Sequence, residues 1–290
     1  MKKAFSLSIT LWMTAALIAG SVFFIKINKQ NLSIASKLKN KLTASIETES
    51  NLALIKYYSA TGEFEKHYIK NNTLKLLPKQ LLIDATPFTF NHSTITLQDT
   101  SGLINTFFPD EPLYRLVEMR KEHNYHIVKN SIEDWLDKDS LSNINGAEEY
   151  FYKQNNRGYL PRNRSFLSHY AELTLIRGFE GLNLKKYLTY VPSYGVNPYT
   201  MNIPTLMLTY GITKQDAQLL IKTKKRDIEN FEKIFNQIEK KYFDPFEQSL
   251  SYSKTLQITI STTIKGATYS SSTLIDFDNF IQLYHDSINF

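Results

Sequence analysis

The chain begins MKKAFSLSITLWMTAALIAGSVFFI (Met1–Ile25), in which no residue from Ala4 onward is charged. An uncharged run of this length matches the ~20 residues that cross the hydrocarbon core of a bilayer. A secretory signal peptide carries its cleavage site after its apolar run. Here the small-residue junction lies before the run, at Ala4–Phe5, so cleavage there would leave the apolar segment on the mature protein. We therefore predict an N-terminal anchor that stays in the membrane.

The residues after the anchor are expected to continue the same helix. Neither Gly nor Pro occurs between Ser21 and Thr61, so nothing there is expected to stop a helix. Apolar residues recur at a spacing of mostly three to four residues, at Ile27, Ile34, Leu38, Leu42 and Ile46. This spacing predicts an apolar stripe. We predict one helix over residues 5–59, on the order of 80 Å long, whose stripe packs on a sheet of the same chain.

Composition narrows the possible functions. The chain contains no cysteine, which excludes disulfides, thiolate metal sites and cysteine nucleophiles. It contains no Gly-x-Ser-x-Gly elbow, Walker loop or dinucleotide-binding fingerprint, so we do not expect an enzyme. The net charge of +6 fits either nucleic acid or anionic lipid headgroups. Because many of the lysines flank the anchor, we favour a membrane-proximal basic collar.

Strand-like runs occur in two groups far apart in the sequence. The first group is Lys66–Lys70, Leu81–Ala85 and Thr94–Gln98, and the second is Leu256–Ile264 and Ala267–Phe277, joined by a Lys265-Gly266 turn. Helical periodicity dominates between the groups, over Leu116–Lys121, Ile132–Leu136, Tyr170–Leu175, Leu182–Val191, Thr213–Lys222 and Ile228–Lys241. These patterns predict an α+β fold, in which the long helix packs on a small antiparallel sheet that a large all-α domain interrupts.

Several motifs resemble one family, in the expected order. The basic start and apolar run resemble the leader of the type IV pilin superfamily, with Ala4 in place of the usual Gly. Leu11-Trp12, together with Ile9 where major pilins carry Glu, is similar to the minor pseudopilin K family of type II secretion. Four later motifs resemble segments of that family: Asp99-Thr-Ser-Gly102-Leu-Ile-Asn105, Glu133-Asp134-Trp135-Leu-Asp137-Lys-Asp139, Gly146-Ala147-Glu148-Glu-Tyr150-Phe-Tyr152 and Glu172-Leu-Thr-Leu-Ile-Arg177-Gly178. The chain departs from the family after Pro198, where only Met201-Asn202-Ile-Pro204-Thr remains of a longer run.

The resemblance implies a pilin-like organisation. We expect a leader at residues 1–4, the transmembrane and amphipathic helix at 5–59, and the first part of the β head at 60–107. The inserted domain is expected at 108–248, with a sterile-alpha-motif-like or helix–hairpin–helix-like fold, and the C-terminal strands of the head at 249–290. A single pass through the inner membrane would leave the C-terminal bulk in the periplasm.

The resemblance also implies a function, at the tip of the type II secretion pseudopilus. A tip subunit would initiate pseudopilus assembly for protein export across the outer membrane. Its partners would be the I- and J-type minor pseudopilins, and prepilin peptidase would process it at Ala4–Phe5. A carboxylate left unpaired between hydrophobic helices is costly. Because a tip subunit has no neighbour above it to neutralise that carboxylate, Ile9 suits this position.

A cluster of acidic residues is the best chemical site in the sequence. Asp134, Asp137, Asp139, Glu148 and Glu149 lie close together in the chain. Calcium takes six to eight oxygen ligands, and carboxylates supply such oxygens. Leu141 and Ser142 fall where an EF-hand loop needs a ligand and a Gly, so an EF-hand is excluded. A looser calcium loop and a solvated acidic turn both remain open, and the resemblance implies calcium.

A second motif, Leu208-Thr-Tyr-Gly211-Ile-Thr213, resembles a helix–hairpin–helix. Five basic residues follow it, at Lys214, Lys222, Lys224, Lys225 and Arg226. Basic faces of this kind bind phosphates in nucleic-acid-binding proteins. The alternative function is therefore a membrane-anchored nucleic-acid-binding or DNA-uptake protein. Thr213 stands where the DNA-binding versions carry a second Gly, so we favour a packing hairpin and expect no nucleic acid.

Overall fold

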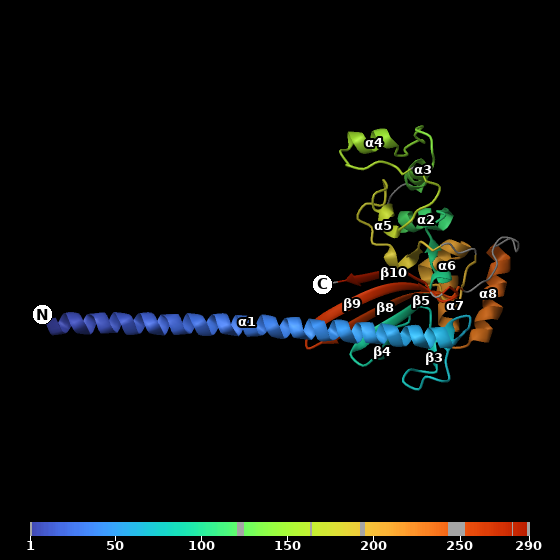
Figure 1. The fold of residues 1–290 in the computed structure, drawn as a ribbon. Coiled ribbons are helices and arrows are strands. Elements are labelled where there is room, and N and C mark those ends of the chain that lie inside the picture. Colours follow the sequence, from blue (N-terminus) through green and yellow to red (C-terminus); the bar gives the residue numbers. More distant parts are fainter. Residues whose placement is uncertain are drawn as a thin grey trace.

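A single long helix carries the rest of the molecule at one end (Figure 1). The computed structural model describes residues 2–120, 125–162, 164–191, 195–242, 253–279 and 281–288. Helix α1 spans Lys2–Thr61 as one element of 60 residues, which corresponds to about 90 Å at ~1.5 Å per residue. It contains no Pro to kink it. The predicted long helix is confirmed.

The face of α1 that packs on the head is not the predicted stripe. Ala44, Thr48, Leu52 and Ile55 are at most 3% exposed. The predicted residues Ile34, Leu38, Leu42 and Ile46 remain 56–64% exposed, so the prediction that they pack on the chain's own sheet is wrong. The spacing identifies a face of a helix but not its partner. At ~100° per residue, the two series lie on faces about 100° apart, and the head covers only the later one.

The head contains a five-stranded antiparallel sheet in the order β10-β9-β8-β5-β4. Its strands are β4 (Phe88–Phe90), β5 (Ser93–Asp99), β8 (Thr255–Ile264), β9 (Ala267–Asp276) and β10 (Ile281–Ile288). Strand β5 pairs with β8 from the far end of the sequence, so the sheet is split as predicted. Lys265 and Gly266 both have positive φ, 46° and 80°, as a type I′ hairpin turn requires. The sequence motifs did not predict β4 or β10.

The core of the head lies between α1 and the sheet. Alternate residues of β5 and β8, such as Ile95, Ile258 and Ile260, are completely buried in a cluster that includes Ile55 of α1. Strands alternate their side chains between two faces, which explains why every second residue is apolar here. A smaller antiparallel sheet completes the head, with β1 (Glu63–Phe64), β2 (Tyr68–Lys70) and β3 (Gln80–Leu82).

The segment between the two groups of strands is mainly helical and forms two packed units. The first has its own core around Trp135 and the second around Phe231. The first unit contains α2 (Glu111–Arg120), α3 (Tyr125–Leu136), α4 (Glu149–Gln154), α5 (Tyr170–Leu173), η2 (Lys185–Tyr187) and the short strands β6 (Ile104–Asn105) and β7 (Leu188–Thr189). The second contains α6 (Ile203–Tyr210), α7 (Lys214–Lys224) and α8 (Ile228–Tyr242).

The predicted helix over Leu182–Val191 is wrong. In the structure, the short 3₁₀ helix η2 and strand β7 occupy this segment. Strand β7 pairs in parallel with β6, so that Leu188 lies opposite Ile104. This pairing joins residues more than eighty positions apart, and such a tertiary contact overrides local periodicity. The predicted boundary between the insertion and the C-terminal strands, at residues 248 and 249, lies outside the described residues.

A buried acidic side chain, Asp99, fastens the second helical unit to the head. Its Oδ1 accepts hydrogen bonds from Ser101 N at 3.0 Å and Ser253 Oγ at 2.7 Å. Its Oδ2 accepts from Ser101 Oγ and Asn197 Nδ2, both at 2.7 Å. Ser253 precedes β8 and Asn197 precedes α6, so one carboxylate joins three distant segments. Satisfied buried networks of this kind fix a unique arrangement.

Candidate metal centre

The candidate metal centre lies at the end of α3, where Asp134 is completely buried. Its Oδ1 accepts hydrogen bonds from Asn143 N at 3.0 Å and Asn143 Nδ2 at 2.6 Å. Its Oδ2 accepts from Ser142 Oγ at 3.1 Å. The chain after α3 therefore turns back so that residues 142 and 143 reach this carboxylate.

Three carboxylates converge at this point. One oxygen each of Asp134, Asp137 and Glu148 lies within 4.8 Å of the other two. Asp137 Oδ1 and Glu148 Oε1 are buried and accept no hydrogen bond from the described residues. Burial, together with the neighbouring carboxylates, raises the pKa of Asp137 and the pKa of Glu148. Unpaired buried oxygens that repel one another are what a bound cation would neutralise, so these three residues fit a metal ion.

The other two predicted ligands, Asp139 and Glu149, do not belong to this converging group. Asp139 Oδ1 accepts a hydrogen bond from Leu141 N at 2.8 Å, and its side chain is exposed. Glu149 begins α4 and forms an ion pair with Lys153 one turn later. The structure thus brings together Asp134, Asp137 and Glu148, and places Asp139 and Glu149 outside this group.

Two further residues shape the loop around the cluster. A Cβ atom on Gly146 would lie 2.0 Å from Asp134 Oδ2, so only Gly fits there. Arg177 Nη1 donates to the carbonyl oxygens of Asn145 at 3.1 Å and Gly146 at 2.9 Å, while its guanidinium stacks over the Phe151 ring. Sequence reasoning assigned no role to either residue, although both stand in the quoted motifs.

The donor set determines which metals fit. All three side chains offer carboxylate oxygens, the ligands that calcium and magnesium prefer. Calcium tolerates irregular geometry and accepts carbonyl oxygens and water for its remaining positions, whereas magnesium demands a smaller octahedron. No redox or hydrolytic step follows from this arrangement. A cation here would hold the loop between α3 and α4 closed.

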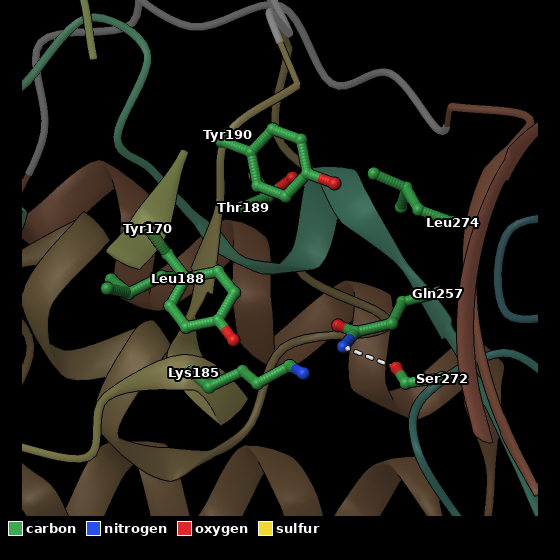
Figure 2. A pocket seen from close by; sticks show the side chains of 8 residues that line it. All are labelled: Tyr170, Lys185, Leu188, Thr189, Tyr190, Gln257, Ser272 and Leu274. Atoms are coloured by element: carbon green, nitrogen blue, oxygen red, sulfur yellow. Dashed lines mark hydrogen bonds between the residues drawn. The ribbon is translucent and has the colours of Figure 1, made fainter. Parts of the chain in front are cut away.

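A small cavity lies where the first helical unit meets the sheet (Figure 2). Lys185 Nζ lies 3.5 Å from Asp286 Oδ2 and 5.2 Å from the centre of the Tyr170 ring. Gln257 Nε2 donates to Ser272 Oγ at 3.4 Å on the opposite wall. The cavity volume is about 20 Å³, which is room for about one water molecule. We therefore assign no ligand to it.

The hairpin at Gly211 is a packing element of the second helical unit. Gly211 ends α6 with a φ of 60°, and Thr213 caps α7 by accepting a hydrogen bond from Asp216 N. Lys224 does not belong to an exposed basic face. Its side chain is 7% exposed, with Nζ 2.8 Å from Asp84 Oδ2 and 2.8 Å from Tyr199 O. The predicted basic face therefore loses Lys224, which connects α7 to the head instead.

The comparisons with known proteins agree with this architecture. The family described as "Type II secretion system (T2SS), protein K" matches residues 111–194, a span that includes the candidate metal centre. Residues 111–194 of this chain are thus similar to the type II secretion protein K family. The resemblance recognised in the sequence motifs is confirmed. No curated protein matches the chain.

A solved structure shares the fold of this chain. It is the crystal structure of the GspK-GspI-GspJ complex from the type 2 secretion system of enterotoxigenic Escherichia coli. The similarity has a TM-score of 0.55 and 16% identity, and covers 90% of this chain and 100% of that chain. At this identity the likeness establishes the α+β fold with its long N-terminal helix.

The N-terminal part of α1 has the length and composition of a membrane-spanning helix. Within the described residues, one helix is long and apolar enough to cross a bilayer, and it lies in α1 near the N-terminus. Ala4, Phe5 and Ile9 belong to α1, but their side chains lie outside the described part of the structure. Processing at Ala4–Phe5 and the role of Ile9 therefore stay predictions.

Proposed function

We propose that this chain is the minor pseudopilin at the tip of the type II secretion pseudopilus, where it initiates assembly for protein export across the outer membrane. The family match carries the proposal, because it falls on the inserted helical domain. Figure 1 shows this domain beside the head, at the end of α1 far from the N-terminus. Bulk at that end supports a tip position, since it obstructs the addition of another subunit there.

The proposal places α1 in the inner membrane and the head in the periplasm. Prepilin peptidase removes residues 1–4 and leaves Phe5 as the new N-terminus. The apolar Ile9 then stands where other subunits carry a glutamate that pairs with the subunit above. A tip subunit lacks that neighbour, so an apolar residue avoids a buried unpaired charge.

We further propose that calcium binds at Asp134, Asp137 and Glu148. Their convergence and the two unpaired buried oxygens support this assignment. Bound calcium supplies positive charge that offsets the repulsion among the carboxylates. Asp134 is already oriented by Asn143 and Ser142, so it provides a fixed point to which the loop can close.

Co-purification tests the tip assignment. Full-length protein, expressed with the I- and J-type minor pseudopilins of its own secretion system, is expected to purify from detergent as a complex with both. N-terminal mass analysis of the same sample should show a chain that begins at Phe5 when the prepilin peptidase is present. Failure to bind either partner contradicts the tip assignment. Retention of Lys2 and Lys3 contradicts processing.

A further inference from the structure

The loop between α3 and α4 is held on one side by Arg177, which follows α5 in the chain. The backbone at this point is anchored to both helices. Arg177 N donates to Tyr152 Oη of α4 at 3.3 Å. A Cβ atom on Gly178 would lie 3.1 Å from Val128 Cγ2 of α3, so the chain passes close to that helix as well. These contacts fix the point from which the Arg177 side chain extends.

The guanidinium of Arg177 contacts the loop backbone and an aromatic ring. Nη1 donates to the carbonyl oxygens of Asn145 at 3.1 Å and Gly146 at 2.9 Å, and Cζ lies 4.6 Å from the centre of the Phe151 ring. Arginine suits this place because its planar head can stack on a ring while it donates hydrogen bonds. Since none of these three contacts is with a carboxylate, the guanidinium does not take the place of the proposed cation.

The backbone that Arg177 holds leads directly to a proposed ligand. Gly146 lies against Asp134, because a Cβ atom on Gly146 would come 2.0 Å from Oδ2. The next residue, Ala147, is completely buried in the core of the first helical unit, and Glu148 follows it. The position of the backbone at residue 146 therefore determines where Glu148 stands relative to Asp134.

Repulsion among the carboxylates acts against this arrangement when no cation is bound. One oxygen each of Asp134, Asp137 and Glu148 lies within 4.8 Å of the other two, and like charges at this separation favour an open loop. The two hydrogen bonds from Arg177 oppose that opening. A site that is already formed loses less conformational freedom when its ligand arrives. Groups that orient metal ligands without touching the metal typically change its affinity ~10–100-fold.

We infer that Arg177 is a positioning residue of the metal centre, which keeps Glu148 beside Asp134 and Asp137 before the cation binds and thereby sets the affinity for calcium. The inference rests on the proposed calcium site. A cationic side chain that acted through its charge alone would oppose a calcium ion. Positioning and charge therefore predict opposite effects when a neutral residue replaces Arg177.

Calcium affinity, measured by titration calorimetry on the full-length protein in detergent, tests the inference. Arg177→Met removes the charge and the donors, and its Kd for calcium is expected to rise at least tenfold. Arg177→Lys keeps the charge but lacks the planar head that stacks and donates together, so its Kd should rise less. Phe151→Leu removes the ring beneath the guanidinium, keeps an apolar side chain, and should also raise the Kd by a smaller factor.

Arg115→Met is the matched control. Arg115 lies in α2 of the same helical unit, and its Nε is 2.6 Å from Glu111 Oε1 one turn earlier. The substitution removes the same charge from an exposed side chain. Because exposed ion pairs contribute little, the Kd for calcium should stay within about twofold of wild type.

Hydrogen exchange in chelator gives a readout that a general loss of stability would not reproduce. The backbone amides of residues 142–147 are expected to exchange about tenfold faster in Arg177→Met than in wild type, because the loop opens locally. The amides of α2 and of β8 should exchange at the wild-type rate. Acceleration of the same size in all three segments assigns Arg177 to general stability and overturns the inference.

The outcomes of the titrations separate the inference from the calcium assignment. Wild type that does not bind calcium contradicts the calcium site and, with it, the inference. Wild type that binds calcium while Arg177→Met binds it equally well or more tightly overturns the inference and leaves the calcium site standing. If Arg177→Met does not fold, an unchanged Kd in both Arg177→Lys and Phe151→Leu overturns the inference in the same way.

Discussion

Two of the centres in which the described residues bury carboxylates are stabilised in different ways. At Asp99, each carboxylate oxygen accepts two hydrogen bonds from backbone, hydroxyl or amide donors. At the cluster of Asp134, Asp137 and Glu148, two buried oxygens accept none from the described residues. Neutral donors satisfy one charge, but they do not remove the repulsion among three charges within 4.8 Å of one another. The first centre is complete without a ligand, and our proposal is that a cation completes the second.

The largest predicted effect concerns a third buried carboxylate, Asp84, which a lysine neutralises directly. Lys224→Ala leaves Asp84 buried and unpaired. We expect a loss of about 3–5 kcal/mol in the free energy of unfolding, measured by denaturant titration of the full-length protein. Lys222→Ala, two residues away and exposed, should cost less than about 0.5 kcal/mol. Equal losses in the two variants contradict the assigned contact.

The second prediction concerns Asp99, whose carboxylate is fully hydrogen-bonded without a ligand. Asp99→Ala leaves the buried donors of Asn197 and Ser101 without their acceptor, so we expect a loss of about 3 kcal/mol. The loss should be the same in calcium and in chelator, because Asp99 is far along the chain from the acidic cluster and binds no metal in this account. A loss that appears only in chelator contradicts the separation of the two centres.

The third prediction disrupts the proposed cation site. Gly146→Ala places a methyl group against Asp134, so it should abolish the gain in melting temperature that calcium gives. Gly158 is the matched control. It has open space around it and a φ of +68°, so Gly158→Ala should cost about 1–2 kcal/mol through backbone strain and keep the full calcium response. A normal calcium response in Gly146→Ala contradicts the site.

The smallest predicted effect is a pH dependence in chelator. The pKa of Glu148 is raised by burial and by its acidic neighbours, so the folded state binds the proton more tightly than the unfolded state. Its contribution to stability is therefore present at low pH and is lost as the pH rises from ~4.3 through the raised pKa. Glu148→Gln should thus gain melting temperature relative to wild type between about pH 4 and pH 7. Glu63→Gln, an exposed change, should show no such trend.

The parts of the fold that the sequence predicted are those governed by local rules. An uninterrupted run without Gly or Pro predicted α1, and Lys265-Gly266 predicted the β8–β9 hairpin. Contacts between distant segments were not predictable in this way. The β6–β7 pairing replaced a predicted helix, and the choice of packing face on α1 depended on where the head folded back.

The candidate metal centre shows the same difference between what local patterns predict and what contacts made by the folded chain decide. Proximity in the sequence suggested five carboxylates, but the turn after Asp134 decides which of them converge. That turn depends on Asn143 reaching back to Asp134 and on the missing Cβ of Gly146. Neither contact has a signature in spacing alone, so spacing did not distinguish Asp139 and Glu149 from the three residues whose oxygens converge.

Thermal unfolding with and without calcium tests the central claim most directly, namely that the second centre needs a cation. Full-length protein in detergent should melt at a higher temperature in millimolar calcium than in chelator. A ligand that binds only the folded state stabilises it by ~2.7 kcal/mol at a hundredfold excess over its Kd. Magnesium should substitute poorly, Asp137→Ala should abolish the difference, and Glu63→Ala should preserve it. Identical melting of the wild type in calcium and in chelator would contradict the account and leave Asp134, Asp137 and Glu148 as an acidic turn without a metal.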